Sequence, residues 1–163
     1  MMSGAERDVQ VETGVREHLQ AGETFRAAVW ASRADGRTVV GMTRAEMSPW
    51  RFRRPAAEKR GVNGAPRSLA VGLDEHLRTV NDPRVLALTD QRLLVLSQRT
   101  GLFRRPSSSD QALRLRWECP RTKLASATEK AGRLRLDFTD GSSVTLLTPT
   151  AEVQPFLTAA ANA

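Results

Sequence analysis

The sequence is poor in several residue types that define particular classes of protein. Its 163 residues include one cysteine, no tyrosine and no isoleucine, and only three of its 25 basic residues are lysine. A single cysteine excludes an internal disulfide and a cysteine-rich metal site. The surroundings of Cys119 match no redox or nucleophile motif, so we expect it to be a small buried apolar residue.

Long hydrophobic runs are also missing. The longest uninterrupted aliphatic run covers residues 93–96, whereas a membrane-spanning helix needs about 20 predominantly apolar residues. Residues 1–10 contain no apolar segment of the kind found in a signal peptide. With 40% hydrophobic and 26% charged residues, the composition is that of a globular protein. We therefore expect one soluble, cytoplasmic domain over residues 1–163.

Positive charge is concentrated in two zones of the chain. The formal net charge is +7, and residues 44–67 carry +5 while residues 84–135 carry +8. Uneven charge speaks about partners and solubility rather than about fold. Two interpretations stay open: an anionic contact surface, or an arginine-rich face exposed to solvent. Codon bias in a high-GC bacterial genome is a further source of arginine in place of lysine.

The first 42 residues predict a helix followed by a hairpin. Apolar residues recur at helical spacing over residues 9–19, which predicts an amphipathic helix. Residues 24–31 have the composition of a strand, and the Asp-Gly turn signal at 35–36 lets residues 37–42 return as a second strand. The apolar residues of the helix are Val11, Val15 and Leu19.

Residues 43–67 lose all periodicity. They contain three prolines and two glycines, with seven basic residues against two acidic ones. This composition predicts an exposed, flexible basic insertion within the domain. Ser68 is a good N-cap for a helix over residues 69–80, with Asp74 and Glu75 on its polar side.

The second half of the chain has the pattern of antiparallel strands. Two apolar runs, 85–88 and 92–96, flank a tight polar turn and predict a hairpin. Residues 113–118 alternate apolar with charged side chains, as a half-buried strand does, and residues 124–128 predict a weaker strand.

The clearest hairpin spans residues 134–147, because an Asp-Gly pair separates two alternating segments. Pro149 then opens a C-terminal helix whose apolar residues share one face. We expect one contiguous core that contains Trp117, Leu134, Leu136, Phe138, Val144, Leu146, Phe156 and Leu157.

The segment Leu-Thr-Asp-Gln-Arg-Leu-Leu at 88–94 resembles a hairpin of the bacterial pleckstrin-homology-like (PH-like) family. Similar family features are a following basic or aromatic strand, a second hairpin of the form G-x-L-x-L-x-F-x-D-G-S, and a terminal helix. They correspond here to residues 117–120, 132–142 and 150–161. The resemblance implies a mainly β (α+β) fold, a PH-like barrel of about seven antiparallel strands in two sheets, capped by the C-terminal helix.

The resemblance also raises the question of phosphoinositide binding. Eukaryotic relatives use a Lys/Arg cluster in the loop that joins the first two strands. The matching turn here, residues 32–37, offers only Arg33 and Arg37, and the Arg51-Phe52-Arg53 element lies outside it. The expected inositide pattern is therefore absent from its usual position in the sequence.

Sequence motifs for catalysis are missing. His18 and His76 lie on separate predicted helices, and neither has an acidic partner at a telling spacing. The chain contains no Gly-x-Gly-x-x-Gly, no P-loop, no nucleophile elbow and no metal-spaced cluster. We expect no enzyme, no cofactor, no metal site and no small-molecule substrate; an enzyme of unknown type remains an alternative.

Candidate binding residues lie in the insertion, where aromatic and guanidinium side chains are interleaved. They are Trp50, Arg51, Phe52, Arg53, Arg54, Lys59 and Arg60. Arginine donates to phosphate oxygens in a fork, while tryptophan and phenylalanine stack on bases or enter a lipid interface. The alternative is a disordered linker whose aromatic residues pack back onto the domain.

The sequence thus favours a non-catalytic interaction module that docks a protein partner or self-associates. The alternative is a peripheral binder of an anionic membrane surface, or of nucleic acid, through the basic residues 44–67.

Overall fold

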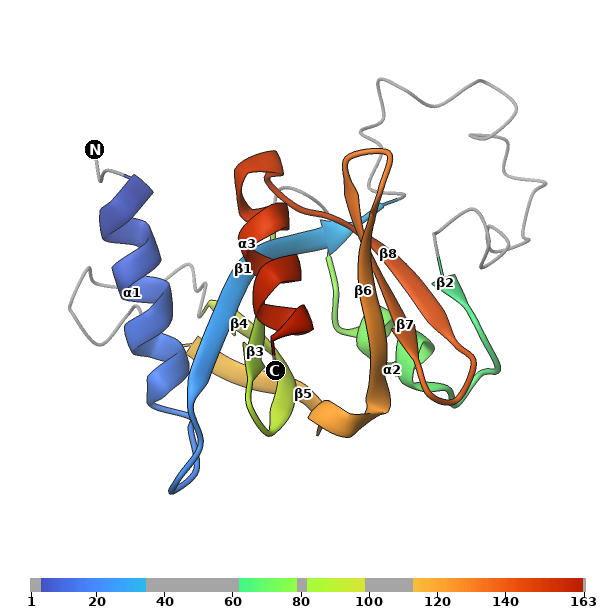
Figure 1. Cartoon of the computed structure of the whole chain (residues 1–163), viewed down its shortest axis with the longest axis horizontal. Coiled ribbons are helices and arrows are strands. Elements are labelled where there is room, and N and C mark those ends of the chain that lie inside the picture. Colours follow the sequence, from blue (N-terminus) through green and yellow to red (C-terminus); the bar gives the residue numbers. More distant parts are fainter. Residues whose placement is uncertain (1–3, 35–61, 79–81, 99–112, 163) are drawn as a thin grey trace, which may run out of the picture.

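The computed structural model describes residues 4–34, 62–78, 82–98 and 113–162 (Figure 1). The elements follow the chain in the order α1 (Gly4–Arg16), β1 (Phe25–Arg33), β2 (Val62–Asn63), α2 (Leu69–Glu75), β3 (Arg84–Thr89), β4 (Arg92–Gln98), β5 (Leu113–Pro120), the 3-10 turn η4 (Arg121–Lys123), β6 (Leu124–Lys130), β7 (Arg133–Phe138), β8 (Ser143–Leu147) and α3 (Thr150–Ala161). None of the helices in these ranges is long and apolar enough to cross a membrane.

The strands form one antiparallel path with the order β5-β4-β3-β1-β8-β7-β6, and β2 is attached to β8. β1 joins the two halves of this path, because its first part pairs with β3 and its last two residues, Ser32 and Arg33, pair with β8. Within the described residues the end strands β5 and β6 do not pair with each other. The mainly β prediction with terminal helices is confirmed, and the predicted barrel of about seven strands is not closed in the described structure.

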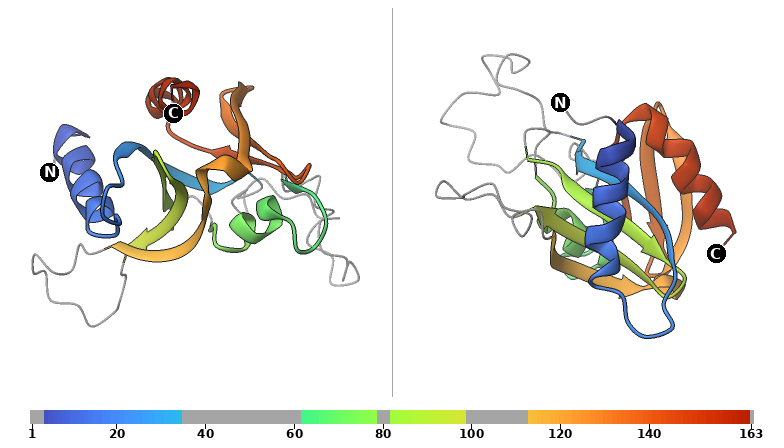
Figure 2. Two further views of the ribbon diagram at one scale, coloured as in Figure 1. Left: turned by 60° about the horizontal axis from the view of Figure 1, so that its bottom comes forward. Right: turned by 90° about the vertical axis from the view of Figure 1, so that its left-hand side faces the viewer.

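The main core lies between the two halves of the sheet. α3 packs against β1, β6 and β7 on one side of this space, and α2 packs against β5, β7 and β8 on another (Figure 2). Of the eight predicted core residues, six are buried here, while Trp117 and Leu157 are partly buried against the cluster. The rings of Trp117 and Phe138 meet edge to face, with centroids 6.3 Å apart.

A second core lies on the outer face of the β3–β4 half, under α1. Val15 of α1 packs there on side chains of β3, β4 and β5, among them Val85 and Leu94. The neighbouring residues Leu86 and Leu93 face the main core. β3 and β4 are therefore covered on both faces, which explains why their sequences are apolar throughout rather than alternating.

A bulge in β5 corrects the prediction that its apolar residues share one face. Val95 pairs with Trp117 and Leu96 with Leu115, so Arg116 is the extra residue on the β5 side. An extra residue exchanges the two faces of a strand. Leu115 consequently packs with the outer core, whereas Trp117 packs with the main one.

The segment between β1 and β3 also departs from its predicted boundaries. Val62 is 1% exposed and pairs with Val144, so the predicted insertion 43–67 ends too late. The predicted helix 69–80 ends at Glu75, and Asp74, expected on its polar side, is 3% exposed. The predicted strand 37–42 lies outside the described residues.

Candidate functional site

The predicted binding residues are not placed by the structure. Trp50, Arg51, Phe52, Arg53, Arg54, Lys59 and Arg60 all fall in 35–61, outside the described residues. Their role stays a prediction, and the described residues offer other candidate sites.

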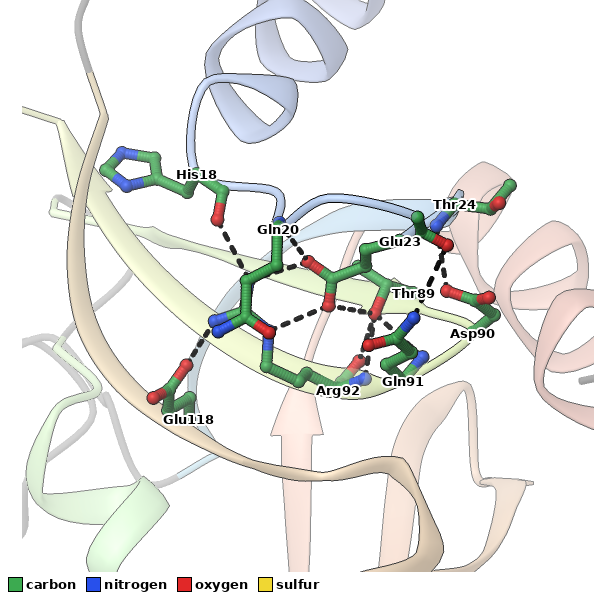
Figure 3. A network of polar contacts seen from close by, with 10 residues as sticks. His18, Gln20, Glu23, Thr24, Thr89, Asp90, Gln91, Arg92 and Glu118 are labelled. Atoms are coloured by element: carbon green, nitrogen blue, oxygen red, sulfur yellow. Dashed lines mark hydrogen bonds and ion pairs between the residues drawn. The ribbon is translucent and has the colours of Figure 1, made fainter.

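The most connected polar group is an ion pair between Glu23 and Arg92 (Figure 3). Arg92 donates to both carboxylate oxygens, at 2.6 and 2.7 Å, to the carbonyl of His18 at 2.9 Å, and to the carboxylate of Glu118. The Thr89 hydroxyl donates to Glu23 at 2.9 Å. The Glu23 side chain is 0% exposed and Arg92 is 11% exposed.

This network joins the turn after α1 to the β3–β4 hairpin. The Arg92 guanidinium holds the pKa of Glu23 at about 2, below its usual 4.5, although burial opposes this shift. Arg92 in turn has a raised pKa, chiefly because it donates to Glu23. The side chains of Glu23 and Arg92 make their hydrogen bonds with other groups of the protein. The network therefore stabilises the fold and leaves few donors or acceptors for a ligand.

His18 and Cys119, which could act as a base and a nucleophile, have structural roles instead. Nε2 of His18 lies 2.7 Å from the carbonyl oxygen of Leu113. Burial raises the pKa of Cys119 to about 12, which keeps it a thiol, and the predicted buried position is confirmed. The described part of the chain holds no group of three or more side chains suited to a metal ion.

A free strand edge is the more promising feature. β6 is an end strand that pairs only with β7 in the described structure. Lys130 and Arg133 close their hairpin around Ala131 (φ 53°) and Gly132 (φ 77°), the geometry of a type I′ turn. Hydrogen-bonded and non-hydrogen-bonded pairs alternate from such a turn. Counting back along β6, the backbone N–H and C=O groups of Ala127 point to the free edge.

A hollow of about 310 Å³ runs between this edge and the last turns of α3. We call it the β6 groove. Its walls include Leu124, Ala125, Ser126 and Ala127 from β6, with Leu157 and Ala160 from α3. Small side chains on an edge strand let another backbone approach closely.

Arg121 stands at one end of the β6 groove. Its guanidinium donates to the carbonyl oxygens of Ala160 and Leu124. Its Nε is buried and has no acceptor among the described residues. At the other end of β6, Gln154 of α3 donates to Glu129 at 2.7 Å. The groove therefore combines an unpaired edge, an apolar wall and one donor without an acceptor.

A separate cluster of arginines lies where β1 ends and β3 begins. Arg33 donates to the carbonyl of Asp74 at 3.0 Å, and Arg84 donates to that of His76 at 3.2 Å, both at the C-terminal end of α2. Burial first, then the charges of Arg78 and Arg116, lower the pKa of Arg84, while Asp82 opposes the shift. The members of this cluster are Arg33, Arg78, Arg84 and Arg116.

The sequence predicted the buried position of Cys119. It did not indicate the ion pair of Glu23 with Arg92, the β6 groove or the arginine cluster, although the segments that contain Glu23, Arg92 and Arg33 stood out. Comparison of the chain with protein-family models, with curated proteins and with solved structures gives no match. The geometry described above therefore carries the functional argument by itself.

Proposed function

We propose that this chain is a non-catalytic interaction module of PH-like type that docks an extended segment of a protein partner along β6. The observation that carries this proposal is the unpaired edge of β6 beside the β6 groove. An extended peptide adds to such an edge through main-chain hydrogen bonds, and neighbouring pockets select its side chains.

The surroundings of β6 favour this mode of binding. Ala125, Ser126 and Ala127 present little side-chain bulk, and Leu157 offers an apolar contact to one side chain of the peptide. A carbonyl or carboxylate oxygen of the peptide would satisfy Nε of Arg121. Leaving a buried donor unpaired costs about 1–3 kcal/mol, so such a contact would add affinity.

The PH-like part of the proposal rests on topology and sequence together. Seven strands form a path in two halves joined by β1, with the C-terminal helix packed on β1, β6 and β7. The resembling segment 88–94 supplies the β3–β4 turn and Arg92, which anchor that half to Glu23. His18 Nε2 lies within hydrogen-bond distance of a backbone carbonyl, and burial keeps Cys119 a thiol. Both observations favour a role without catalysis.

A proline substitution tests docking along β6. Ala127→Pro removes an N–H that the β6–β7 ladder does not use, and edge strands tolerate proline at such positions. Peptides without lysine or arginine, selected from a random display library on the full chain, should bind this variant at least about tenfold more weakly, which is 1.4 kcal/mol. Ala127→Ser keeps the N–H and should bind as the wild type does.

Hydrogen exchange supplies the structural readout. Bound peptide should slow exchange of the Ala127 amide, while the melting temperature of Ala127→Pro stays near that of the wild type. Selected peptides that bind Ala127→Pro as tightly as the wild type would show that β6 is not the docking edge. If sedimentation instead finds a wild-type dimer that Ala127→Pro dissociates, the occupant is a second copy of the chain.

A second candidate function is peripheral binding to an anionic surface, and the arginine cluster favours it. Asp74 and Asp82 pair with Arg33 and Arg84, each at 3.7 Å, so the cluster retains excess positive charge. The basic segment 44–67 of the sequence prediction follows the C-terminal end of β1 in the chain. Phosphate contacts by such residues weaken steeply with added salt.

The second candidate is tested by co-sedimentation with vesicles that contain phosphatidylserine and by filter binding of single-stranded DNA, each at low and near-physiological salt. Replacing Arg51, Arg53 and Arg54, or separately Arg78 and Arg116, with serine should reduce retention and leave the melting temperature nearly unchanged. Wild-type protein that binds neither ligand at low salt would remove this candidate.

A further inference from the structure

A second hollow, of about 350 Å³, lies on the other side of α3, between α3, β1 and α1. We call it the α1/α3 cleft. Its floor is the part of β1 before Ser32, which pairs with β3 but with no other strand in the described structure. Apolar side chains on its walls are Val11, Phe25, Trp30 and Pro155. An apolar hollow beside an unpaired strand edge is suited to an extended peptide.

Glu152 of α3 lies in this cleft and is incompletely satisfied. Its carboxylate accepts the backbone N–H of Trp30 on the unpaired side of β1. Its Oε2 is buried and has no hydrogen-bond donor among the described residues. Burial, and then the nearby charge of Asp8, raise the pKa of Glu152. A carboxylate in this position gains from any cation or donor that enters beside it.

The charge of the cleft contrasts with that of the chain. Among the described residues that line it, Asp8, Glu12 and Glu152 are acidic and Arg26 is basic, whereas the chain carries +7 overall. Glu12 is already paired with Arg16 of its own helix at 2.5 Å. Asp8 and Glu152 are therefore the two carboxylates placed to receive a cation from outside, one from each helix.

We propose that the α1/α3 cleft is a second docking site, which takes a basic peptide segment of a partner protein. A lysine or arginine side chain lies between Asp8 and Glu152, and the apolar residues beside it contact Phe25 and Trp30. Nonspecific attraction cannot produce this binding, because a chain of net charge +7 repels a basic peptide at long range. Recognition depends on the local carboxylates and is independent of the β6 groove.

The test is a fluorescence anisotropy titration of the full chain, at physiological salt, with two labelled peptides. One alternates arginine with leucine and alanine; the other carries citrulline in place of each arginine, which removes the charge and keeps the shape. The wild type should bind the arginine peptide at least about tenfold more tightly, the effect of 1.4 kcal/mol. Ala127→Pro should bind it as the wild type does, which separates this site from β6.

Substitutions in the cleft identify the carboxylates. Glu152→Gln and Asp8→Asn should each weaken the arginine peptide about tenfold or more. Glu152→Gln should not lower the melting temperature, because it removes a poorly compensated charge while it keeps the acceptor for Trp30. Glu17→Gln makes the same change after α1 and outside the cleft, and should leave binding unchanged. Equal binding of the two peptides, equal binding by Glu152→Gln and the wild type, or no binding by the wild type would each overturn the proposal.

Discussion

The guanidinium of Arg92 donates two hydrogen bonds to the carboxylate of Glu23, at 2.6 and 2.7 Å, although 69 positions separate the two residues in the chain. Glu23 lies in the turn before β1, and Arg92 begins β4. The pair therefore fastens the turn that follows α1 to the far side of the β3–β4 hairpin (Figure 3). A buried pair of this kind fixes one arrangement of the elements, because the fully buried Glu23 charge would lose its ion pair with Arg92 in any other arrangement.

Glu23→Gln should destabilise the protein by about 3–5 kcal/mol, since it removes the buried counter-ion of Arg92 and leaves only the half-exposed Glu118. Urea denaturation at neutral pH measures this change in the free energy of unfolding. The control is Glu12→Gln, which breaks an exposed pair with Arg16 on α1 and should change stability by less than about 0.5 kcal/mol. Equal effects of the two substitutions would show that the Glu23 pair contributes no more than a surface pair.

The same pair makes stability depend on pH in the acid range. The pKa of Glu23 is about 2 in the folded chain and near 4.5 when the side chain is free, so the unfolded state binds the proton more readily. Its contribution is therefore complete above pH 4.5 and is lost as the pH falls from 4.5 toward 2. Glu23→Gln should flatten the stability profile over this window. A wild-type profile as flat as that of the variant would contradict the assignment.

Local sequence patterns predicted most of the strands. The alternation in 134–147 and the apolar runs around Thr89 are local signals, and the structure has strands there. The pairing of Val62 with Val144, and the exchange of faces at Arg116, depend on contacts between segments far apart in the chain. Because no local pattern encodes such contacts, they could not be predicted from the sequence.

For the candidate sites, too, local sequence signals were visible and long-range arrangements were not. Basic residues 44–60 stood out by composition, yet they lie outside the described structure. Apart from Arg121, the β6 groove is lined by alanine, serine and leucine, which carry no chemical signal in a sequence. Only the sheet order reveals that the edge beside them is unpaired. Glu152 likewise looked like an ordinary acidic residue in the first turn of a helix.

Ala131 offers a stabilising substitution. It has φ 53° in the two-residue turn between β6 and β7, a left-handed conformation that costs an L-residue about 1–2 kcal/mol. Asparagine followed by glycine is the preferred pair for this turn, so Ala131→Asn should stabilise the protein by about 0.5–1 kcal/mol. Gly132→Ala, at φ 77° in the same turn, should have the opposite sign. Thermal unfolding of the two variants separates them, and two shifts in the same direction would contradict a type I′ turn.

Gly14 lets α1 lie close to Leu113 of β5. A Cβ atom at this position would lie 2.9 Å from Cδ1 and Cγ of Leu113, whose side chain is almost fully buried in the outer core. Alanine is the better helix former by about 1 kcal/mol, but overpacking a core costs about 1–3 kcal/mol. Gly14→Ala should therefore destabilise the wild type by about 1 kcal/mol in urea denaturation.

Shortening the opposing side chain should reverse this sign. In a Leu113→Ala background the Cβ atom that Gly14→Ala adds meets no obstacle, so only the gain in helix propensity remains, and Gly14→Ala should stabilise by about 0.5–1 kcal/mol. The two substitutions thus form a double-mutant cycle with a coupling energy of about 1.5–2 kcal/mol. A cycle with no coupling would mean that α1 does not rest on Leu113. α1 forms one wall of the α1/α3 cleft and carries Asp8. If α1 does not pack on Leu113, Asp8 does not line the cleft, and Asp8→Asn should then leave peptide binding unchanged.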